Sequence, residues 1–102
     1  MGRQATRVYT SPEDIARLER CVERLAVNAW VRIALRDGDA VEGMVTVTPT
    51  VQMFYDVDGN EGVNGVVTLE DVRRPDWRGD VWLGDIAAVE HLDSVVRGVS
   101  RA

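Results

Sequence analysis

The sequence has no lysine and a single cysteine, and both shortages limit what the protein can be. All 12 basic residues are arginine, and the 17 acidic residues outnumber them, so the formal net charge is −5. An acidic protein is poorly suited to non-specific binding of nucleic acid or of an anionic membrane, because phosphate groups are neutralised by basic surface. With Cys21 as the one cysteine, an internal disulfide is excluded.

Long apolar runs are missing as well. No stretch approaches the roughly 20 apolar residues that span a bilayer, and residues 1–10 lack the apolar core of a signal peptide. We therefore expect a cytoplasmic protein with no membrane partner. What the chain does contain, 102 residues of which 45% are hydrophobic and 28% charged, is typical of one globular domain with one core.

Residues 11–26 have the pattern of an amphipathic helix. Ser11 suits the N-cap, Pro12 suits the first helical position, and the two acidic residues that follow favour the positive end of the helix dipole. Apolar residues then recur at helical spacing, at Ile15, Leu18 and Leu25. We predict that this helix covers a sheet formed by the residues after it, since its apolar stripe needs a partner.

Residues 29–58 predict a meander of strands. Apolar and polar residues alternate over 31–36, and Asp37-Gly38 between two alternating runs is a strong hairpin signal. Gly43 marks a bend or a close backbone approach within the second strand, and Pro49 marks a strand end. The remaining predicted elements are a turn cluster at 58–62, strand-like runs at 65–72 and 81–83, a polar loop at 73–80 and a last strand at 86–92.

These elements predict a mainly β domain, α+β by element count, over residues 11–92. The helix is followed, at 29–92, by a small, strongly bent, five-stranded antiparallel barrel. An open α+β sheet with the helix across one face is the alternative. Residues 1–10 are expected to form a flexible tail from which Tyr9 could dock on the helix, and residues 93–102 a second flexible tail.

Two parts of the chain resemble the motifs of the Sm-like (LSm) domain, a barrel of the SH3-like kind. The first comprises Val31, Ile33, Leu35, Asp37, Gly38, Glu42, Gly43, Val45 and residues 51–56. The second comprises residues 81–89, which are similar to the closing strands of that family, including those of the bacterial RNA chaperone Hfq. More closely, most of the chain resembles a small family of uncharacterised proteins from Xanthomonas-type bacteria, described as a variant Sm-like fold.

This resemblance implies a non-enzymatic Sm-like barrel that pairs its edge strands with neighbouring copies and binds RNA bases in the loop between its second and third strands. Sm-like domains place an Asp and an Asn in that loop. Here Pro49 and Thr50 lie near the Asp position, and Gln52, near the Asn position, keeps an amide for a base edge. The second motif places a basic residue before a glycine, whereas here Leu83 precedes Gly84.

A basic and aromatic cluster occurs in the polar loop, at Arg73, Arg74, Trp77 and Arg78, with Trp82 nearby. Arginine pairs with phosphate and tryptophan stacks on bases, so the cluster is a candidate for binding nucleic acid. Two other interpretations stay open. Trp and Arg are also enriched at protein interfaces, and acidic residues within the loop would offset the arginines in an ordinary solvated segment.

Motifs for catalysis or metal binding are not apparent. His91 is the only histidine and is interpreted as a strand residue at the barrel rim. Asp56, Asp58, Asn60 and Glu61 resemble part of a calcium loop, but the predicted flanks are strands rather than the two helices of an EF-hand, which favours a hairpin turn. The sequence has no nucleophile elbow or phosphate-binding glycine loop, so we expect no enzyme activity and no cofactor.

We therefore predict a non-enzymatic Sm-like domain that self-associates and contacts single-stranded RNA. The predicted contact residues are Gln52, Arg73, Arg74, Trp77 and Arg78. A homodimer is favoured over a ring, because the connection at 59–80 is longer than a minimal Sm-like connection and would obstruct ring closure. The alternative is a protein–protein interaction adaptor without a nucleic-acid role, which the acidic balance favours.

Overall fold

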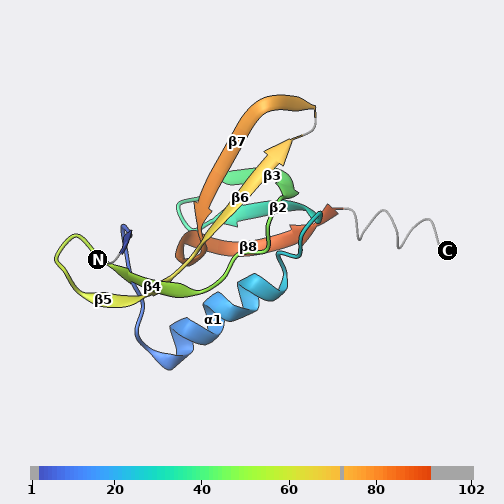
Figure 1. Ribbon diagram of the computed structural model, residues 1–102. Coiled ribbons are helices and arrows are strands. Elements are labelled where there is room, and N and C mark those ends of the chain that lie inside the picture. Colours follow the sequence, from blue (N-terminus) through green and yellow to red (C-terminus); the bar gives the residue numbers. More distant parts are fainter. Residues whose placement is uncertain (1–2, 72, 93–102) are drawn as a thin grey trace.

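The computed structural model describes residues 3–71 and 73–92, which form one α-helix and two β-sheets (Figure 1). In chain order the elements are β1 (Arg3–Gln4), α1 (Pro12–Glu23), β2 (Trp30–Leu35), β3 (Ala40–Val45), β4 (Gln52–Tyr55), β5 (Glu61–Asn64), β6 (Val66–Asp71), β7 (Arg74–Trp82), the 3-10 helix η1 (Leu83–Asp85) and β8 (Ile86–His91). The expected tail at 93–102 lies outside the described residues.

The helix begins where the sequence predicts and ends earlier. The Oγ of Ser11, the N-cap, accepts a hydrogen bond from the backbone N–H of Asp14 at 3.1 Å. Instead of continuing to residue 26, α1 ends at Glu23, because the backbone N–H of Arg24 bonds back to the carbonyl of Cys21 at 3.1 Å and tightens the last turn. Among the described residues, no helix is long and apolar enough to cross a membrane.

The core lies between α1 and a five-stranded sheet with the strand order β7-β6-β3-β2-β8. Every pairing within this sheet is antiparallel. The largest fully buried apolar side chains are Leu18, Leu25, Val31, Ile33, Val45, Val67, Leu69 and Leu83. The alternating residues of β2 and the helical spacing of α1 therefore meet in one core, as the sequence predicts.

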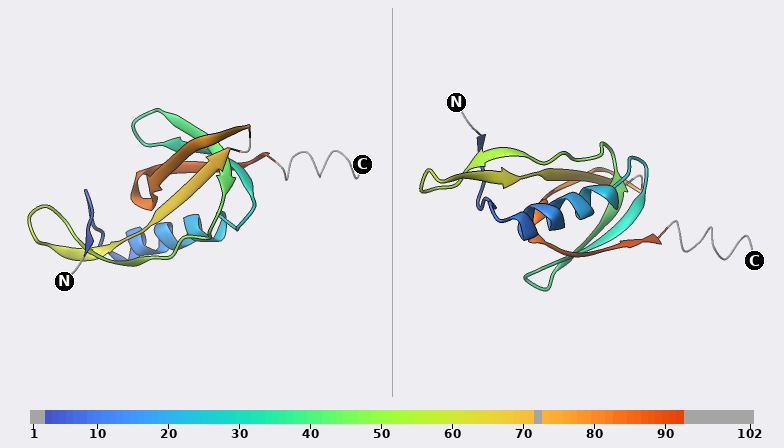
Figure 2. Two further views of the ribbon diagram at one scale, coloured as in Figure 1. Left: turned by 45° about the horizontal axis from the view of Figure 1, so that its top comes forward. Right: turned by 90° about the horizontal axis from the view of Figure 1, so that it is seen from below.

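One helix and mostly antiparallel strands confirm the coarse prediction, but the described strands form two sheets and the larger one does not close, so the prediction of a five-stranded barrel is wrong and the alternative of an open sheet is confirmed. In the part of the chain that the structure describes, β7 and β8 are the two edges of this sheet. A second sheet, of order β1-β4-β5, forms beside it from the N-terminal segment and the residues between β3 and β6. In the right-hand view of Figure 2, α1 lies between the β4–β5 hairpin and β8, where its apolar face packs.

Two glycines allow the strands to bend and approach each other. A Cβ on Gly43 would lie 3.0 Å from the Cβ of Leu69 and 3.2 Å from the ring of Trp77, which confirms the close approach predicted there. Gly65 joins β5 to β6, and a Cβ on it would lie 2.6 Å from the carbonyl oxygen of Thr50. Only glycine fits at this junction, where the chain passes from one sheet to the other.

Residues 73–80 are mostly strand β7 rather than the predicted polar loop. Thr68 pairs with Asp80 and Glu70 with Arg78, after which the register shifts at the bulge between Glu70 and Asp71. The strand was hidden in the sequence because it lies at a sheet edge, where polar side chains and Pro75 are tolerated. The predicted turn cluster likewise contains the start of β5, which pairs with β4.

Within the segment predicted as a flexible tail (1–10), residues 3–9 contact the second sheet. β1 pairs in parallel with β4, and Tyr9 forms an isolated antiparallel bridge with Val63 of β5. The Tyr9 ring does reach the helix, since the guanidinium carbon of Arg17 lies 5.3 Å from its centroid. Backbone pairing and the Tyr9 ring together dock this segment.

Candidate nucleic-acid interface

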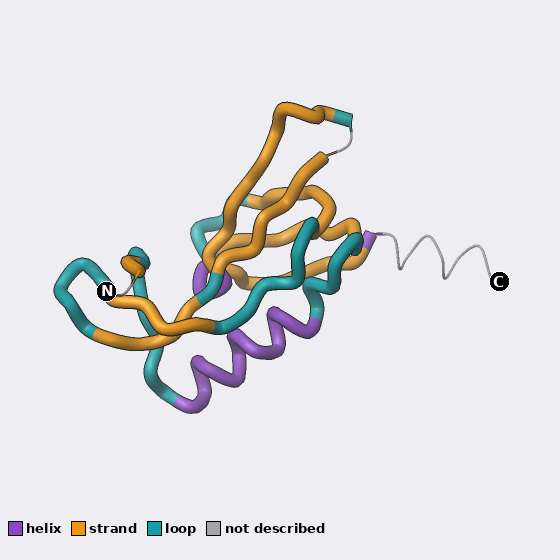
Figure 3. The backbone as a smooth tube through the Cα atoms, viewed as in Figure 1, coloured by secondary structure: helices purple, strands orange, loops and turns teal. Residues whose placement is uncertain are grey.

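A groove of about 470 Å³ lies between the loop that joins β3 to β4 and the β6–β7 hairpin. Figure 3 shows this loop passing alongside the strands without regular structure. The groove is lined by Gln4, Thr46, Val47, Thr48, Pro49, Thr50, Gln52, Phe54, Gly65, Val66, Thr68, Arg78 and Trp82. We call it the threonine groove; it contains two of the five predicted contact residues, Gln52 and Arg78.

An aromatic pair forms one wall of the threonine groove. Phe54 of β4 is 4% exposed and meets Trp82 of β7 edge to face, with ring centroids 5.3 Å apart and an interplanar angle of 84°. This contact fixes the plane of the half-buried Trp82 ring. The sequence marks Trp82 only as a neighbour of the arginine cluster, and it marks Thr50 and Phe54 only through the Sm-like resemblance; Thr46, Thr48 and Thr68 carry no sequence signal.

The polar lining of the threonine groove carries hydroxyl, amide and guanidinium groups. The Nε2 of Gln52 donates a hydrogen bond to the Oγ1 of Thr50 at 2.7 Å. Among the described residues that line the groove, Arg78 is charged and none is acidic. Asp80, its near neighbour on β7, accepts a hydrogen bond from the Oγ1 of Thr68 at 2.7 Å and so is held by the strand beside it.

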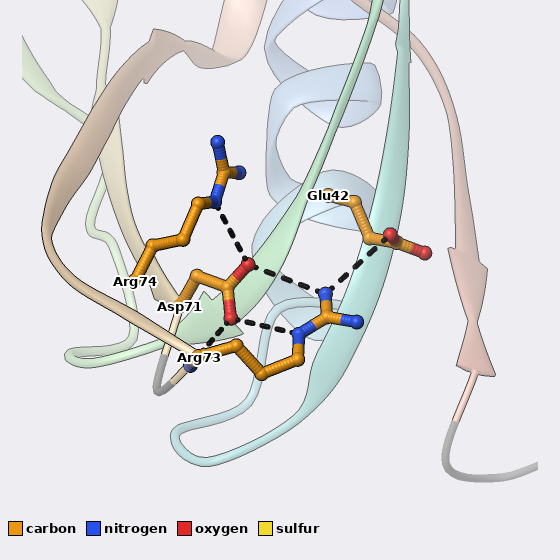
Figure 4. A network of polar contacts seen from close by, with 4 residues as sticks. All are labelled: Glu42, Asp71, Arg73 and Arg74. Carbon is orange, nitrogen blue, oxygen red and sulfur yellow. Dashed lines mark hydrogen bonds and ion pairs between the residues drawn. The ribbon is translucent and has the colours of Figure 1, made fainter.

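Arg73 and Arg74 lie at the far end of the β6–β7 hairpin and are paired to one carboxylate (Figure 4). Asp71, 3% exposed, accepts hydrogen bonds from Arg73 Nε at 3.1 Å, Arg73 Nη2 at 3.2 Å and Arg74 Nε at 3.4 Å. The side-chain hydrogen bond from Arg73, followed by that from its backbone N–H, holds the pKa of Asp71 below its ordinary value. A weaker ion pair joins Arg73 Nη2 to Glu42 Oε1 at 4.0 Å.

Both arginines also stack on tryptophans. The guanidinium carbon of Arg73 lies 5.1 Å from the ring centroid of Trp30, and that of Arg74 lies 5.1 Å from the ring centroid of Trp77. Trp77 itself packs against the core. We call Trp30, Glu42, Asp71, Arg73, Arg74 and Trp77 the hairpin cluster. The structure thus brings Gln52 and Arg78 together in the threonine groove and places Arg73, Arg74 and Trp77 in a separate, internally paired group.

Neither of the other sequence candidates is arranged as a metal or catalytic site. The carboxylate of Asp56 accepts hydrogen bonds from the backbone N–H groups of Asp58 and Asn60, and from the Asn60 side chain, so it closes its own turn. These bonds, led by that from the Asn60 side chain, lower the pKa of Asp56. His91 Nε2 donates to the carbonyl oxygen of Arg24, which ties β8 to the end of α1. Within the described residues, no group of three or more His, Cys, Asp or Glu side chains could hold a metal ion.

Comparison with known proteins assigns the chain to a family and finds a similar solved structure. Residues 2–92 match the family described as "Domain of unknown function (DUF3247)". The chain belongs to this family. It is also similar to the crystal structure of XC5848 from Xanthomonas campestris, described as adopting a novel variant of the Sm-like motif, with 35% sequence identity, a TM-score of 0.84, and coverage of 90% of this chain and 99% of that one. Among curated proteins, none matches.

The predicted resemblance to a variant Sm-like fold is confirmed. Pro49, Thr50 and Gln52, which the sequence resemblance predicts to lie near the base-contacting positions of Sm-like domains, all line the threonine groove. Leu83, at the position of the second motif's basic residue, is fully buried in the core. The first position therefore faces an open groove, while the second has become part of the packing.

Proposed function

We propose that this protein is a non-enzymatic, cytoplasmic Sm-like domain that binds single-stranded RNA in the threonine groove. One observation carries the proposal. Gln52, Arg78 and Trp82, which come from β4 and from two positions of β7, line one groove that has no acidic side chain among its described residues, although the chain has a net charge of −5. A groove lined by an arginine and by no described carboxylate is suited to an anionic ligand, with Asp80 beside it bonded to Thr68.

Each of these side chains has a role in the proposed complex. The half-buried Trp82 offers a ring face on which a base can stack, and Phe54 keeps that ring in place. Arg78 pairs with a phosphate at the rim. Gln52 and Thr50 supply amide and hydroxyl groups for the edge of an unpaired base. The groove volume, about 470 Å³, lies within the range of about 300–1,000 Å³ found for small-ligand sites, which suits one nucleotide.

RNA titration with charge-neutralising variants tests this proposal. We expect a fluorescently labelled, unstructured 12-nucleotide RNA to bind at low salt and to bind Arg78→Gln about tenfold more weakly. Arg36→Gln, which removes an equal charge from the exposed β2–β3 turn, is the matched control and should bind normally. Absence of binding at low salt, or equal weakening by both substitutions, would refute the proposal.

Hairpin-cluster variants separate the groove from the arginine cluster predicted from the sequence. Because Arg74 is bonded to Asp71 and stacked on Trp77, Arg74→Gln should leave RNA affinity within about twofold of the wild type. A larger loss from Arg74→Gln than from Arg78→Gln would move the RNA site from the threonine groove to the hairpin.

We also propose that the protein forms a homodimer. An open sheet presents unpaired backbone groups along its edges, here β7 and β8, which invites pairing with another copy. A ring would require both edges, one from each neighbour. The edge of β8 is obstructed for a folded copy, because α1 forms the opposite wall of the groove beside it. Pairing of the β7 edges of two copies would form a closed dimer. Native mass spectrometry over a concentration series would detect this dimer. A monomer at all concentrations, or a ring, would contradict the proposal.

A protein-interaction adaptor is the second candidate, and a specific observation favours it. Several apolar side chains are exposed around β4 and the turn after it, with Met53 53% and Val57 72% exposed. An acidic surface with exposed apolar groups suits a protein partner better than nucleic acid. If no RNA binds at low salt, this function replaces the first.

A further inference from the structure

A second groove lies between α1 and β8. It has a volume of about 470 Å³ and is lined by Arg17, Arg20, Cys21, Arg24, Ile86, Ala87, Ala88 and Val89. We call it the arginine groove. The two grooves have none of their described lining residues in common, so a ligand of the arginine groove would bind whether or not RNA occupies the threonine groove.

The helical wall of the arginine groove is strongly basic. Arg17, Arg20 and Arg24 are spaced by three and four residues, which places them on one helix face over about 10 Å of its length. Within the described chain, no acidic residue lines this groove. Cys21 lies among these arginines in the lining of the groove. Burial raises the pKa of its thiol, and the positive charges of Arg17, Arg20 and Arg24 oppose that rise.

The guanidinium of Arg17 stacks on the Tyr9 ring but lacks hydrogen-bond acceptors in the described part of the chain. Its side chain is only 26% exposed, and its ion pair, from Nη2 to Asp14 Oδ1, is 3.7 Å long. Both terminal nitrogens are shielded from solvent and make no hydrogen bond to any described residue. A guanidinium that is shielded but unsatisfied gains free energy when an acceptor reaches it.

The opposite wall is the edge of a sheet. In the described residues β8 pairs only with β2. The carbonyl oxygen of Val89 accepts its hydrogen bond from Arg24, which shows that this backbone group faces the groove and not β2. The exposed side chains of Ala87 and Ala88 are small, so a chain could approach the strand closely.

We propose that the arginine groove binds an acidic peptide segment, which adds to β8 as an extra strand and directs its carboxylates toward the arginines of α1. Residues that share a face of an extended strand are about 6.7 Å apart. The helical rise from Arg20 to Arg24, about 6 Å, therefore matches two acidic residues in an acidic-x-acidic arrangement. Strand addition supplies backbone hydrogen bonds, and the arginines supply selectivity for negative charge.

The chemistry of the two walls favours this occupant over two others. A nucleic-acid backbone could pair with the arginines, but it has no regularly spaced N–H groups to offer to the carbonyls of a strand edge. A second copy would bring β7 or β8 with the body of a folded domain behind it. With α1 forming one wall, the groove admits a single extended chain more readily than a sheet.

The test uses the full chain and a synthetic probe, an acetylated and amidated octapeptide of alternating Glu and Thr. We expect it to bind at low salt and to shift the backbone amide resonances of Ala87 and Ala88. Arg20→Gln, at an exposed helical position, should weaken binding about fivefold or more without unfolding the protein. Arg36→Gln, the matched control, should not. The same peptide with Lys in place of Glu should fail to bind.

Three further outcomes are decisive. Retention of full affinity by a peptide that is N-methylated at alternate residues would overturn strand addition, because such a peptide cannot pair along one edge. Shifts confined to residues outside β8 and α1, or no binding of the acidic peptide, would overturn the site. Displacement of the peptide by single-stranded RNA from the same amides would overturn the choice of occupant and assign the arginine groove to nucleic acid.

Discussion

The hydroxyl of Tyr9 donates a hydrogen bond to the carbonyl oxygen of Gly84 at 3.3 Å and so joins the N-terminal segment to η1. The ring lies so close to Gly84 that an added Cβ would be 2.6 Å from the Tyr9 hydroxyl oxygen. Gly84 belongs to the stretch that resembles the second Sm-like motif, and Leu83 before it is a core residue. In this member of the DUF3247 family, Gly84 therefore provides a contact that docks the N-terminal segment.

Gly84→Ala should destabilise the protein by about 1–3 kcal/mol, because the methyl group overlaps a buried ring that has no room to move. Denaturant unfolding measures the loss. The double-mutant cycle with Tyr9→Ala is the control, since removing the ring removes the overlap and Gly84→Ala should then cost much less. Additive losses would show that the strain lies elsewhere.

Asn64→Ala should destabilise the protein by about 2–4 kcal/mol, because it leaves buried backbone groups without partners. Asn64 is 1% exposed; its Nδ2 donates to the Arg7 carbonyl at 2.9 Å, and its Oδ1 accepts from the N–H groups of Gly65 at 2.8 Å and Gly84 at 3.1 Å. Denaturant unfolding again measures the change. Asn60→Ala, in an exposed turn, is the control and should cost less than about 1 kcal/mol. Equal losses would contradict the role assigned to Asn64.

The sequence predicts the features that depend on neighbouring residues and misses those that depend on contacts between distant residues. The cap at Ser11, the Asp37-Gly38 hairpin and the alternation of β2 depend on neighbouring residues, and all three are present. Closure of the sheet depends on whether β7 meets β8, and no local pattern reports that. In the described structure α1 packs beside the β8 edge, and at Gly65 the chain returns from the second sheet to the five-stranded one.

The candidate site shows the same division. Arg73, Arg74 and Arg78 are neighbours in the sequence and were predicted to act together. The register shift between Glu70 and Asp71 separates them, leaving Arg78 opposite Glu70 and Arg74 opposite Asp71. Gln52 was placed by its resemblance to an Sm-like position, and it does line a groove. The buried Asn64 was part of an unremarkable Asn-Gly pair, because its three partners are known only once the chain has folded.

The thiol of Cys21 should make stability fall at alkaline pH. Burial raises its pKa above the ordinary value of 9.0. The folded protein therefore holds this proton more tightly than the unfolded chain, so the contribution to stability is full below pH 9.0 and is lost as pH rises through the folded pKa. Unfolding curves of the wild type and Cys21→Ala, measured from neutral to alkaline pH, should converge as pH rises. A constant difference between them would contradict a raised pKa.

Asp71 should produce the opposite pH dependence. Its pKa is lowered, first by the side-chain hydrogen bond from Arg73 and then by the backbone bond, relative to the ordinary value of 3.8. The unfolded chain binds this proton more tightly, so the stabilising contribution is present above pH 3.8 and disappears as pH falls through the folded pKa. Asp71→Asn should therefore be less stable than the wild type at neutral pH, and the difference in unfolding free energy should shrink in acid.

Two controls make the Asp71 experiment specific to the hairpin cluster. Asp76→Asn removes an exposed carboxylate of the same hairpin and should leave stability at neutral pH nearly unchanged. RNA affinity provides the second control: the hairpin cluster and the threonine groove have no described residue in common, so Asp71→Asn should alter stability while leaving any RNA binding at Arg78 intact. If Asp71→Asn instead strengthened RNA binding, pairing with Asp71 would be what keeps Arg73 and Arg74 from binding RNA. The RNA site would then have to include the end of the hairpin.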